Sequence, residues 1–323
     1  MTFDATNRTV TVTLRVSRFT PKPRKAARRR SGSPFGGRSS SPFGGDASSS
    51  RSTRARGKRW TQEYTLDAHA SDSVLDCLLT VKREQDPSLA FRYSCGHGMC
   101  GSDAVAINGT PTLLCTAKVQ DWAKPDSPEY IEDKGFRPTG QPVDDSANAI
   151  DFDSLSAGTP LVIELAALPG FPTQRDLIAD IDPMLDQIRR LKPYLQAKGE
   201  LKTTADGKIN AFEYLQNPAE LERYELLSNC IACGVCEGSC PVYAGGEAFV
   251  GPAAMIAASR FINDSRDDAL DFRLSSLMGS DGASACQSVR ACSMHCPKGI
   301  DVGEELWQTI QKVDAAKKAA ATD

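Results

Sequence analysis

The chain has 323 residues, of which 40% are apolar and 24% are charged, and its formal net charge is -3. This balance is typical of water-soluble globular proteins and excludes a fibrous, wholly disordered or membrane-embedded chain. The longest apolar stretch, residues 161–171, is interrupted by Glu164 and Pro169 and is shorter than the roughly 20 residues that span a bilayer. Any attachment to a membrane is therefore expected to come through partner proteins.

The N-terminal part of the sequence predicts two paired strands separated by an insertion. Residues 9–19 and 60–66 alternate apolar and polar side chains, which is the pattern of half-buried β-strands. Between them, residues 22–59 contain 12 Lys or Arg against the single acid Asp46, and the motif SPFGG occurs twice. Such a stretch buries too little apolar surface to offset the entropy of ordering. We expect a disordered basic insertion at about residues 22–58 that is solvated, with no nucleic-acid partner.

A change of pattern along the chain predicts two domains of different class. Residues 71–73 offer N-caps for a helix that begins near Val74 and ends near Asp86. Residues 120–160 are rich in Pro, Asp, Ser and Gly, which predicts a long loop and hinge. Beyond it, a 3.6-residue periodicity predicts helices over residues 176–195, 218–227, 253–262 and 302–313. We therefore expect an α+β protein with domains at residues 1–150 and 151–323.

The 11 cysteines stand mostly in short-spaced runs, which indicates metal ligation in a reducing compartment rather than disulfide bonds. The first run places Cys95, Cys100 and Asp103 ahead of Cys115. This is the plant-type [2Fe-2S] spacing C-x4-C-x2-C…C with aspartate in the third place. Thiolates suit iron as soft ligands, and glycines within the run allow the backbone to wrap closely. Asp103 is a candidate oxygen ligand; ligation by Ser102, an all-sulfur arrangement with a displaced loop, and a turn aspartate that binds local amides remain alternatives.

The other two runs predict a pair of larger clusters. Residues 230–241 match the bacterial ferredoxin pattern C-x2-C-x2-C-x3-C-P in full, in which three cysteines bind one cluster and the fourth reaches across to another. Residues 286–297 keep the same frame, with Val289 in place of the second cysteine. Counting ligands predicts a [4Fe-4S] cluster on Cys230, Cys233, Cys236 and Cys296. The three remaining thiolates favour a [3Fe-4S] cluster, with a [4Fe-4S] cluster that has a non-protein fourth ligand as the alternative; they are Cys240, Cys286 and Cys292.

Two other metal sites fit the cysteines less well. Zinc also accepts four thiolates at C-x2-C spacing, but ten cysteines grouped three, four and three do not divide into four-thiolate sites. His97 and His295 lie near cysteines in a pattern that superficially resembles a Rieske pair, but those cysteines belong to fuller runs. The two histidines are expected at most to tune a cluster through hydrogen bonds. Cys77, the eleventh cysteine, is expected to be a buried thiol on the first helix, and His69 a surface residue.

These runs, in this order, resemble the iron-sulfur subunit of succinate dehydrogenases and the closely related fumarate reductases. The resemblance covers residues 9–313 apart from two insertions, and it includes DPSLAFR at residues 86–92, KPYL at 192–195 and CPKG at 296–299. It implies an N-terminal β-grasp [2Fe-2S] ferredoxin-like domain and a C-terminal all-α dicluster ferredoxin-like domain.

The resemblance also implies a function and partners. A flavoprotein subunit would oxidise succinate at its FAD, and electrons would pass through the [2Fe-2S], [4Fe-4S] and [3Fe-4S] clusters to a quinone beside membrane-anchor subunits. The chain would carry no catalytic residue itself and would lie on the cytoplasmic face of the plasma membrane, held by the anchors. The full set of three cluster motifs makes a succinate:quinone oxidoreductase the leading hypothesis, and Asp103 resembles some succinate-oxidising members. A fumarate reductase subunit and a free-standing multicluster ferredoxin are the alternatives.

The sequence departs from the family pattern at the quinone end. Well-known members have a tryptophan a few residues after the cysteine that matches Cys240 and a histidine after the one that matches Cys286. Here these neighbourhoods contain Tyr243 and Gln287. The hydroxyl of Tyr243 could donate to a quinone carbonyl, but a buried interface tyrosine needs no such role. The quinone and its pocket therefore stay open.

Overall fold

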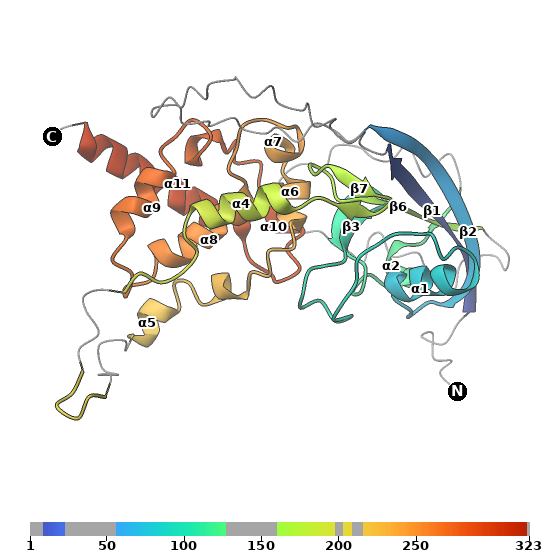
Figure 1. Ribbon diagram of the computed structural model, residues 1–323, viewed down its shortest axis with the longest axis horizontal. Helices are drawn as coiled ribbons and strands as arrows, with labels where there is room; N and C mark the ends of the chain where they lie inside the picture. Colours follow the sequence, from blue (N-terminus) through green and yellow to red (C-terminus); the bar gives the residue numbers. More distant parts are fainter. Residues whose placement is uncertain (1–8, 23–55, 127–159, 198–202, 209–215, 322–323) are drawn as a thin grey trace, which may run out of the picture.

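The computed structural model describes residues 9–22, 56–126, 160–197, 203–208 and 216–321. Figure 1 shows an elongated molecule in which the strands gather at one end with α1 and α2, and the other helices extend toward the opposite end. Most of the expected basic insertion lies outside the described residues, and so does the expected domain boundary between residues 150 and 151. Among the helices that the structure describes, none has both the length and the apolar character that crossing a membrane requires.

A mixed six-stranded sheet forms the N-terminal domain, with the strand order β2-β1-β6-β3-β4 and β5 paired to β6. β1 and β2 are antiparallel, as predicted, and run longer than the alternating pattern indicated. β1 and β6 are parallel, whereas β3 is antiparallel to both β4 and β6. The strands are β1 (Thr9–Pro21), β2 (Gly57–His69), β3 (Ala104–Ile107), β4 (Thr110–Leu113), β5 (Lys124–Pro125) and β6 (Leu161–Ala167).

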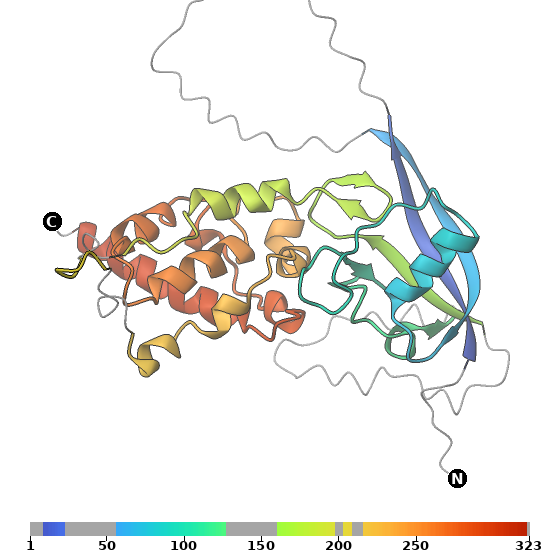
Figure 2. The same ribbon diagram turned by 60° about the horizontal axis from the view of Figure 1, so that its bottom comes forward.

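Helix α1 (Val74–Glu84) packs against this sheet, as Figure 2 shows, and the arrangement is the expected β-grasp fold. The predicted N-cap is confirmed: Ser73 accepts a hydrogen bond from the Asp76 amide, and the Asp76 carboxylate accepts one from the Ser73 amide. This reciprocal pair fixes where the helix begins. Leu78 and Val81 then face the buried side chains of β1, and each buried aliphatic side chain contributes about 1.5 to 3 kcal/mol to folding.

The sheet takes a central strand from beyond the expected hinge. Residues 161–167 form β6, with Val12 opposite Leu161 and Val16 opposite Leu165 in parallel register. The long polar stretch before β6 supplied no local signal for this pairing, because the partner strand lies about 150 residues earlier in the sequence. The N-terminal domain therefore extends past residue 167.

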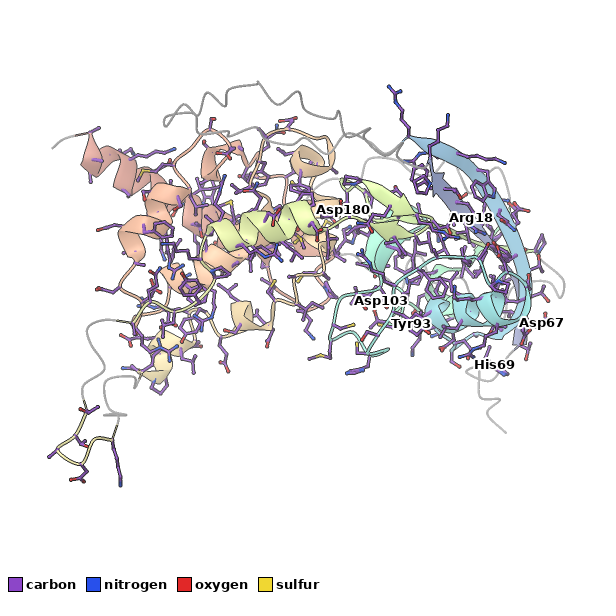
Figure 3. The ribbon with its side chains drawn as sticks, viewed as in Figure 1. Arg18, Asp67, His69, Tyr93, Asp103 and Asp180 are labelled. Carbon is purple, nitrogen blue, oxygen red and sulfur yellow. The ribbon has the colours of Figure 1, made fainter. Side chains whose placement is uncertain are left out.

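A hairpin replaces the beginning of the helix predicted at residues 176–195. β7 (Thr173–Arg175) pairs with β8 (Ile178–Ala179), and the helix α4 (Asp182–Arg190) begins only after it. Asp176 sits at the turn with φ of 44°, and its carboxylate accepts hydrogen bonds from the amides of Phe19 and Ala90, each at 3.0 Å. It also forms an ion pair with the buried Arg18, which Figure 3 labels. These tertiary contacts override the local helical periodicity.

The C-terminal domain consists of helices and loops, as predicted. The predicted helices at residues 253–262 and 302–313 are confirmed, the second with two further turns, whereas residues 218–227 form two short helices with a break between them. The elements after α4 are α5 (Pro218–Leu221), η4 (Leu226–Asn229), α6 (Val235–Ser239), α7 (Pro241–Ala244), α8 (Pro252–Ile262), α9 (Leu270–Ser276), η5 (Ala283–Ala285), α10 (Ala291–Met294) and α11 (Val302–Ala320). A short helix, α2 (Val119–Trp122), lies in the N-terminal domain.

Buried charge and apolar packing hold the helical domain together and join it to the sheet. The guanidinium of Arg273 pairs with Asp267 at 2.6 Å and donates to the carbonyls of residues 191, 192 and 194, so that it fixes the KPYL segment. Where the domains meet, Leu168 and Phe171 pack with Met184 and Ala253 in a separate apolar cluster. The two domains therefore share a packed boundary rather than a loose tether.

Candidate metal centres

The first cysteine run forms a loop between α1 and β3 whose amides point at its sulfurs. The amides of Met99 and Cys100 donate to Cys95 Sγ at 3.4 and 3.3 Å, and the amide of Gly98 donates to Cys115 Sγ at 3.3 Å. Hydrogen bonds from the amides of His97 and Met99 lower the pKa of the Cys95 thiol to about 7. The loop is thus arranged to stabilise thiolate, the form of cysteine that binds metal.

Asp103 lies in this loop with one oxygen occupied and the other free. Its side chain is only 3% exposed, and Oδ2 accepts a hydrogen bond from the Cys115 amide at 2.7 Å. Oδ1 is buried without a hydrogen-bond partner among the described residues. A buried carboxylate oxygen without a partner costs free energy, so a ligand to this atom is expected. The loop also contains Cys100, whose Sγ lies 3.1 Å from Ser102 Oγ. Cys115 follows β4, outside this loop, and burial raises its pKa to about 12.

The first loop touches the second cysteine run directly. A Cβ atom on Gly101 would lie 2.6 Å from the Cβ of Cys233, and the φ of Gly101 is +67°. Only glycine meets both conditions, because any side chain would clash and the left-handed conformation would strain it. Figure 3 shows Asp103 and Tyr93 on the side of the sheet domain nearer the helices, whereas Asp67 and His69 lie at the far end. His69 is thus remote from the cysteine loop.

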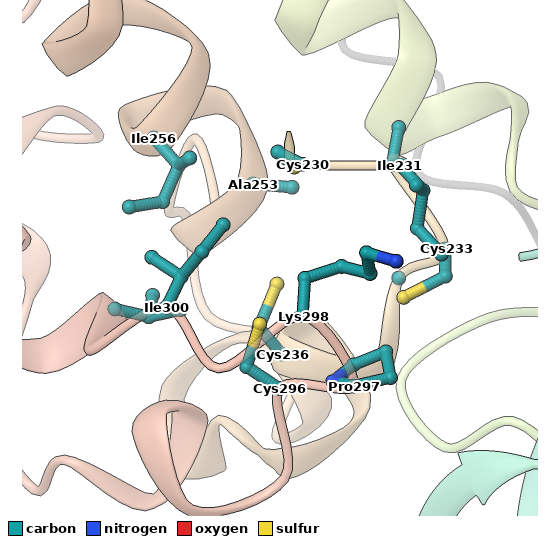
Figure 4. A pocket seen from close by; sticks show the side chains of 13 residues that line it. Cys230, Ile231, Cys233, Cys236, Ala253, Ile256, Cys296, Pro297, Lys298 and Ile300 are labelled. Atoms are coloured by element: carbon teal, nitrogen blue, oxygen red, sulfur yellow. The ribbon is translucent and has the colours of Figure 1, made fainter. Parts of the chain in front are cut away.

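Four cysteines from two runs line one hollow in the helical domain. They are Cys230, Cys233, Cys236 and Cys296, and Figure 4 shows them with the surrounding apolar side chains. The hollow contains about 380 Å³ of space free of atoms, including the part open to solvent. Among the described residues, no three His, Cys, Asp or Glu side chains converge closely enough to hold a single metal ion.

The remaining three cysteines of the runs also lie together. Burial, together with negative charge on Cys240 and Cys286, raises the pKa of Cys292 to about 12. Burial and negative charge on Cys286 also raise the pKa of Cys240. The last cysteine of each of these two runs, Cys240 or Cys296, therefore lies with the cysteines of the other run, as the ferredoxin pattern predicts. The two groups are linked through α6, which contains Cys236 of one group and has Cys240 of the other as its C-cap.

The backbone places Val289 where the second run has a cysteine. Ala232 and Ser288, which precede these positions, have φ values of 50° and 55°. The following residues, Gly234 and Arg290, have φ values of 80° and 62°. The two loops therefore share an uncommon backbone conformation, with left-handed residues on both sides of the central position. Val289 has no atom that could bind iron, and its side chain is 38% exposed.

A buried carboxyl group, Glu237, lies beside the second run and was missed by the sequence reasoning. Its Oε1 accepts a hydrogen bond from the Ala253 amide at 2.8 Å, and the Cys236 thiol donates to Oε2 at 3.0 Å. Burial raises the pKa of Glu237 to about 6. The sequence signal was a glutamate inside the C-x3-C segment, where its neighbours on both sides are candidate ligands.

The other residues singled out from the sequence have structural surroundings. Cys77 is buried in the sheet-helix core on α1, away from the runs, and burial raises its pKa to about 12. The Nδ1 of the exposed His97 lies 2.7 Å from the Cys95 carbonyl oxygen, and His295 follows α10 directly. Tyr243 packs its ring against Phe171, with ring centroids 5.5 Å apart, at the domain boundary. This packing favours a structural role for Tyr243 over contact with a quinone.

Comparison with known proteins first defines the class of protein. Residues 13–186 match the family model of a 2Fe-2S iron-sulfur cluster binding domain, and residues 226–300 match that of a 4Fe-4S dicluster domain. These two regions coincide with the sheet domain and with the helical domain that contains the crossed cysteine runs. The chain is therefore a two-domain iron-sulfur protein, and the expected fold class is confirmed.

Similar proteins then define the family. The chain is 33% identical over 240 residues to the fumarate reductase iron-sulfur subunit of Mycobacterium tuberculosis, covering 74% of this chain and 80% of that one. It is 30% identical over 254 residues to the corresponding subunit of Escherichia coli O157:H7, covering 79% and 85%. It is 33% identical over 243 residues to a mitochondrial succinate dehydrogenase [ubiquinone] iron-sulfur subunit 2 of Oryza sativa, covering 74% and 65%. The chain belongs to the family of fumarate reductase and succinate dehydrogenase iron-sulfur subunits.

A solved structure supports the same fold. A chain of the Mycobacterium smegmatis Sdh1 complex in the apo form superposes with a TM-score of 0.63 at 20% identity, covering 96% of this chain and 98% of that chain. The shared fold therefore extends over both domains. The resemblance inferred from the cysteine runs is confirmed.

Proposed function

We propose that the chain is the electron-transferring iron-sulfur subunit of a succinate:quinone oxidoreductase, the enzyme class of respiratory complex II. In this function it carries electrons from a flavoprotein subunit to a quinone through three clusters. The succinate site lies on the flavoprotein, and this chain contributes cluster ligands rather than catalytic residues.

The contact between Gly101 and Cys233 is the observation that carries the proposal. It joins the first cysteine loop to the hollow of four cysteines, and α6 joins that hollow to the group of Cys240, Cys286 and Cys292. Three groups of ligands therefore follow one another across a protein that would otherwise insulate them. A metal-storage or structural role would not require such a series.

The ligands divide among the clusters by what the structure brings together. The first loop supplies a [2Fe-2S] site, in which the unpartnered Oδ1 of Asp103 is the fourth ligand. The hollow of four cysteines supplies a [4Fe-4S] site, and the third group supplies a [3Fe-4S] site because Val289 leaves one corner without a ligand. The proposed ligands are Cys95, Cys100, Asp103 and Cys115; Cys230, Cys233, Cys236 and Cys296; and Cys240, Cys286 and Cys292.

The protein prepares these ligands in two different ways. In the first loop, amide hydrogen bonds favour the Cys95 thiolate before iron binds. In the helical domain, burial raises the pKa of Cys233 and Cys292 to about 12, so iron must displace their protons. When bound, the clusters accept and release single electrons, and the buried apolar surroundings limit the access of water to them.

Exposed apolar side chains at the two ends of this series favour partner binding there. Tyr93 and Met99, beside the first loop, are 52% and 54% exposed. Val289 and Met294, beside the third group, are 38% and 46% exposed. We assign the first surface to the FAD-containing flavoprotein and the second to the membrane-anchor subunits and the quinone. The anchors would hold the chain at the cytoplasmic face of the plasma membrane.

Purification of the intact complex from membranes tests the proposal. We expect the chain to co-purify with a flavoprotein and anchor subunits and the complex to reduce quinone with succinate faster than quinol reduces fumarate. A faster reverse reaction would favour the fumarate reductase alternative, which the names of several relatives also support. A stable monomer with saturated clusters and no flavoprotein would contradict the proposal in favour of a free-standing ferredoxin.

A further inference from the structure

Lys298 lies between the first cysteine loop and the hollow of four cysteines. It follows Cys296 and Pro297, and its side chain lines the hollow together with Cys230 and Cys233. In Figure 4 it extends across the hollow toward the loop that carries Cys233. Its Nζ also lies 3.1 Å from the Sδ of Met99, a residue of the first loop. One ammonium group therefore borders both the first cysteine loop and the hollow of four cysteines.

The contact with Met99 ties Lys298 closely to the first loop. The Met99 amide donates to Cys95 Sγ at 3.4 Å, so the backbone of this residue faces one candidate ligand while its thioether faces the ammonium. A thioether is a weak acceptor and leaves the positive charge almost unneutralised. Because Lys298 is only half-buried, water can still solvate part of its side chain.

The charge of Lys298 has no anionic partner in the part of the chain that the structure describes. None of the ion pairs among the described residues includes it. The thiolates that the proposed four-iron cluster requires line the same hollow as Lys298. Opposite charges attract more strongly in partly buried surroundings than in water, and hydrogen bonds and charge near the sulfurs set a cluster's potential.

We propose that Lys298 is a positioning residue that tunes electron transfer between the first two clusters. The inference rests on the proposed function and names a residue that tunes one of its steps. In that step the reduced two-iron cluster loses one electron and the four-iron cluster gains it; no bond breaks and no proton moves. The positive charge beside the four-cysteine hollow stabilises the more negative, reduced state of the four-iron cluster.

Redox titration of the intact complex, followed by EPR, tests this role. We expect Lys298→Gln to lower the reduced-to-oxidised ratio of the four-iron cluster at a fixed potential by about tenfold, which corresponds to about 59 mV for one electron. Lys298→Arg should restore the wild-type ratio because it restores the charge. The matched control is Lys208→Gln, which removes the same charge from residues 203–208, at the lower left in Figure 1, and should leave the ratio unchanged. The three-iron cluster should titrate as in the wild type in all variants.

Three results would overturn the inference. The first is a four-iron cluster that is present in Lys298→Gln and titrates as in the wild type. The second is the same shift in Lys208→Gln, which would show a general effect of net charge. The third is loss of the four-iron signal in both Lys298→Gln and Lys298→Met with retention in Lys298→Arg, which would assign the charge to cluster assembly. A wild-type complex without any cluster signal would instead contradict the proposed function, so the two failures are distinguishable.

Discussion

Residues 230–236 and 286–292 form two loops of equal length that begin and end with cysteine. They differ in the candidate ligand at the central position. Both loops have left-handed residues on either side of that position, at Ala232 and Gly234 in the first and at Ser288 and Arg290 in the second. The first loop places Cys233 there and the second places Val289. The comparison shows that the backbone conformation is shared whereas the side chain at the central position is not. Under the proposed cluster assignment, this one side chain sets how many irons are held.

The second lesson concerns the surroundings of the two positions. Cys233 faces the first cysteine loop across a contact that admits only glycine at residue 101. Val289, in contrast, is 38% exposed. In the proposed series, Cys233 therefore stands where electrons would enter from the first cluster, and Val289 stands where the series would end toward a partner.

Replacing Cys233 by valine should have the largest effect, because it removes from residues 230–236 the central ligand that residues 286–292 also lack. Loss of a hydrogen-bond partner behind a metal ligand costs about 10- to 100-fold in metal affinity, and loss of the ligand itself should cost more. We expect the reduced four-iron EPR signal to disappear and succinate-dependent quinone reduction to fall in proportion. The matched control is Cys77→Val, which replaces a buried thiol outside the nests and should retain all cluster signals. An unchanged four-iron signal in Cys233→Val would contradict the ligand assignment.

Replacing Val289 by cysteine tests the comparison from the other side. The shared backbone should aim the new thiol at the open corner, so the three-iron cluster should gain a fourth iron. EPR of the oxidised complex should lose its three-iron signal, and iron analysis should show about one more iron per chain. Because Val289 is partly exposed, the substitution should change stability by no more than about 0.5 kcal/mol. Val289→Ala is the control and should keep the three-iron signal; persistence of that signal in Val289→Cys would argue against the frame.

The left-handed positions that follow the central residues should respond differently to substitution. Gly234→Ala places a methyl group 3.2 Å from Leu168 Cδ2 in a conformation that costs an L-residue about 1 to 2 kcal/mol. Arg290→Gly relieves that cost but removes an exposed ion pair with Glu304, which is worth about 0 to 1 kcal/mol. The thermal midpoint of the purified complex should fall by a few degrees for Gly234→Ala and stay nearly constant for Arg290→Gly. A fall of similar size in Arg290→Gly would contradict the shared left-handed conformation of the two segments.

The pH dependence of iron uptake should differ least between the two loops. Burial raises the pKa of both Cys233 and Cys292 to about 12, so iron binding must release a proton from each. Each proton released weakens apparent binding about tenfold for every unit by which the pH falls. In reconstitution of the apoprotein at pH 7 to 9, the loading of both clusters should rise in parallel with pH. Loading that is independent of pH, or that rises for one cluster alone, would contradict this account.

The cysteine runs could be predicted from sequence because their spacing is local. The paired strands β1 and β2, the capped helix α1 and the long helices α8 and α11 also follow local patterns and were predicted correctly. Asn108 and Gly109 have φ values of 49° and 83° at the turn between β3 and β4, and an Asn-Gly pair was a usable signal for that hairpin.

The remaining features depend on contacts between distant residues. The strand β6 belongs to the sheet because it pairs with β1, and no pattern within residues 161–167 specifies that partner. The β7–β8 turn exists because Asp176 is held by the amides of Phe19 and Ala90. The position of Lys298 against Met99 joins residues that are 199 apart in the sequence. Its role could not be inferred until the two domains were placed together.

Iron and sulfide analysis combined with EPR of the purified complex tests the central claim most directly. The account predicts a three-iron signal in the oxidised complex, and separate two-iron and four-iron signals after reduction. Zinc in place of iron, or a complex with no paramagnetic centre in either state, would contradict it.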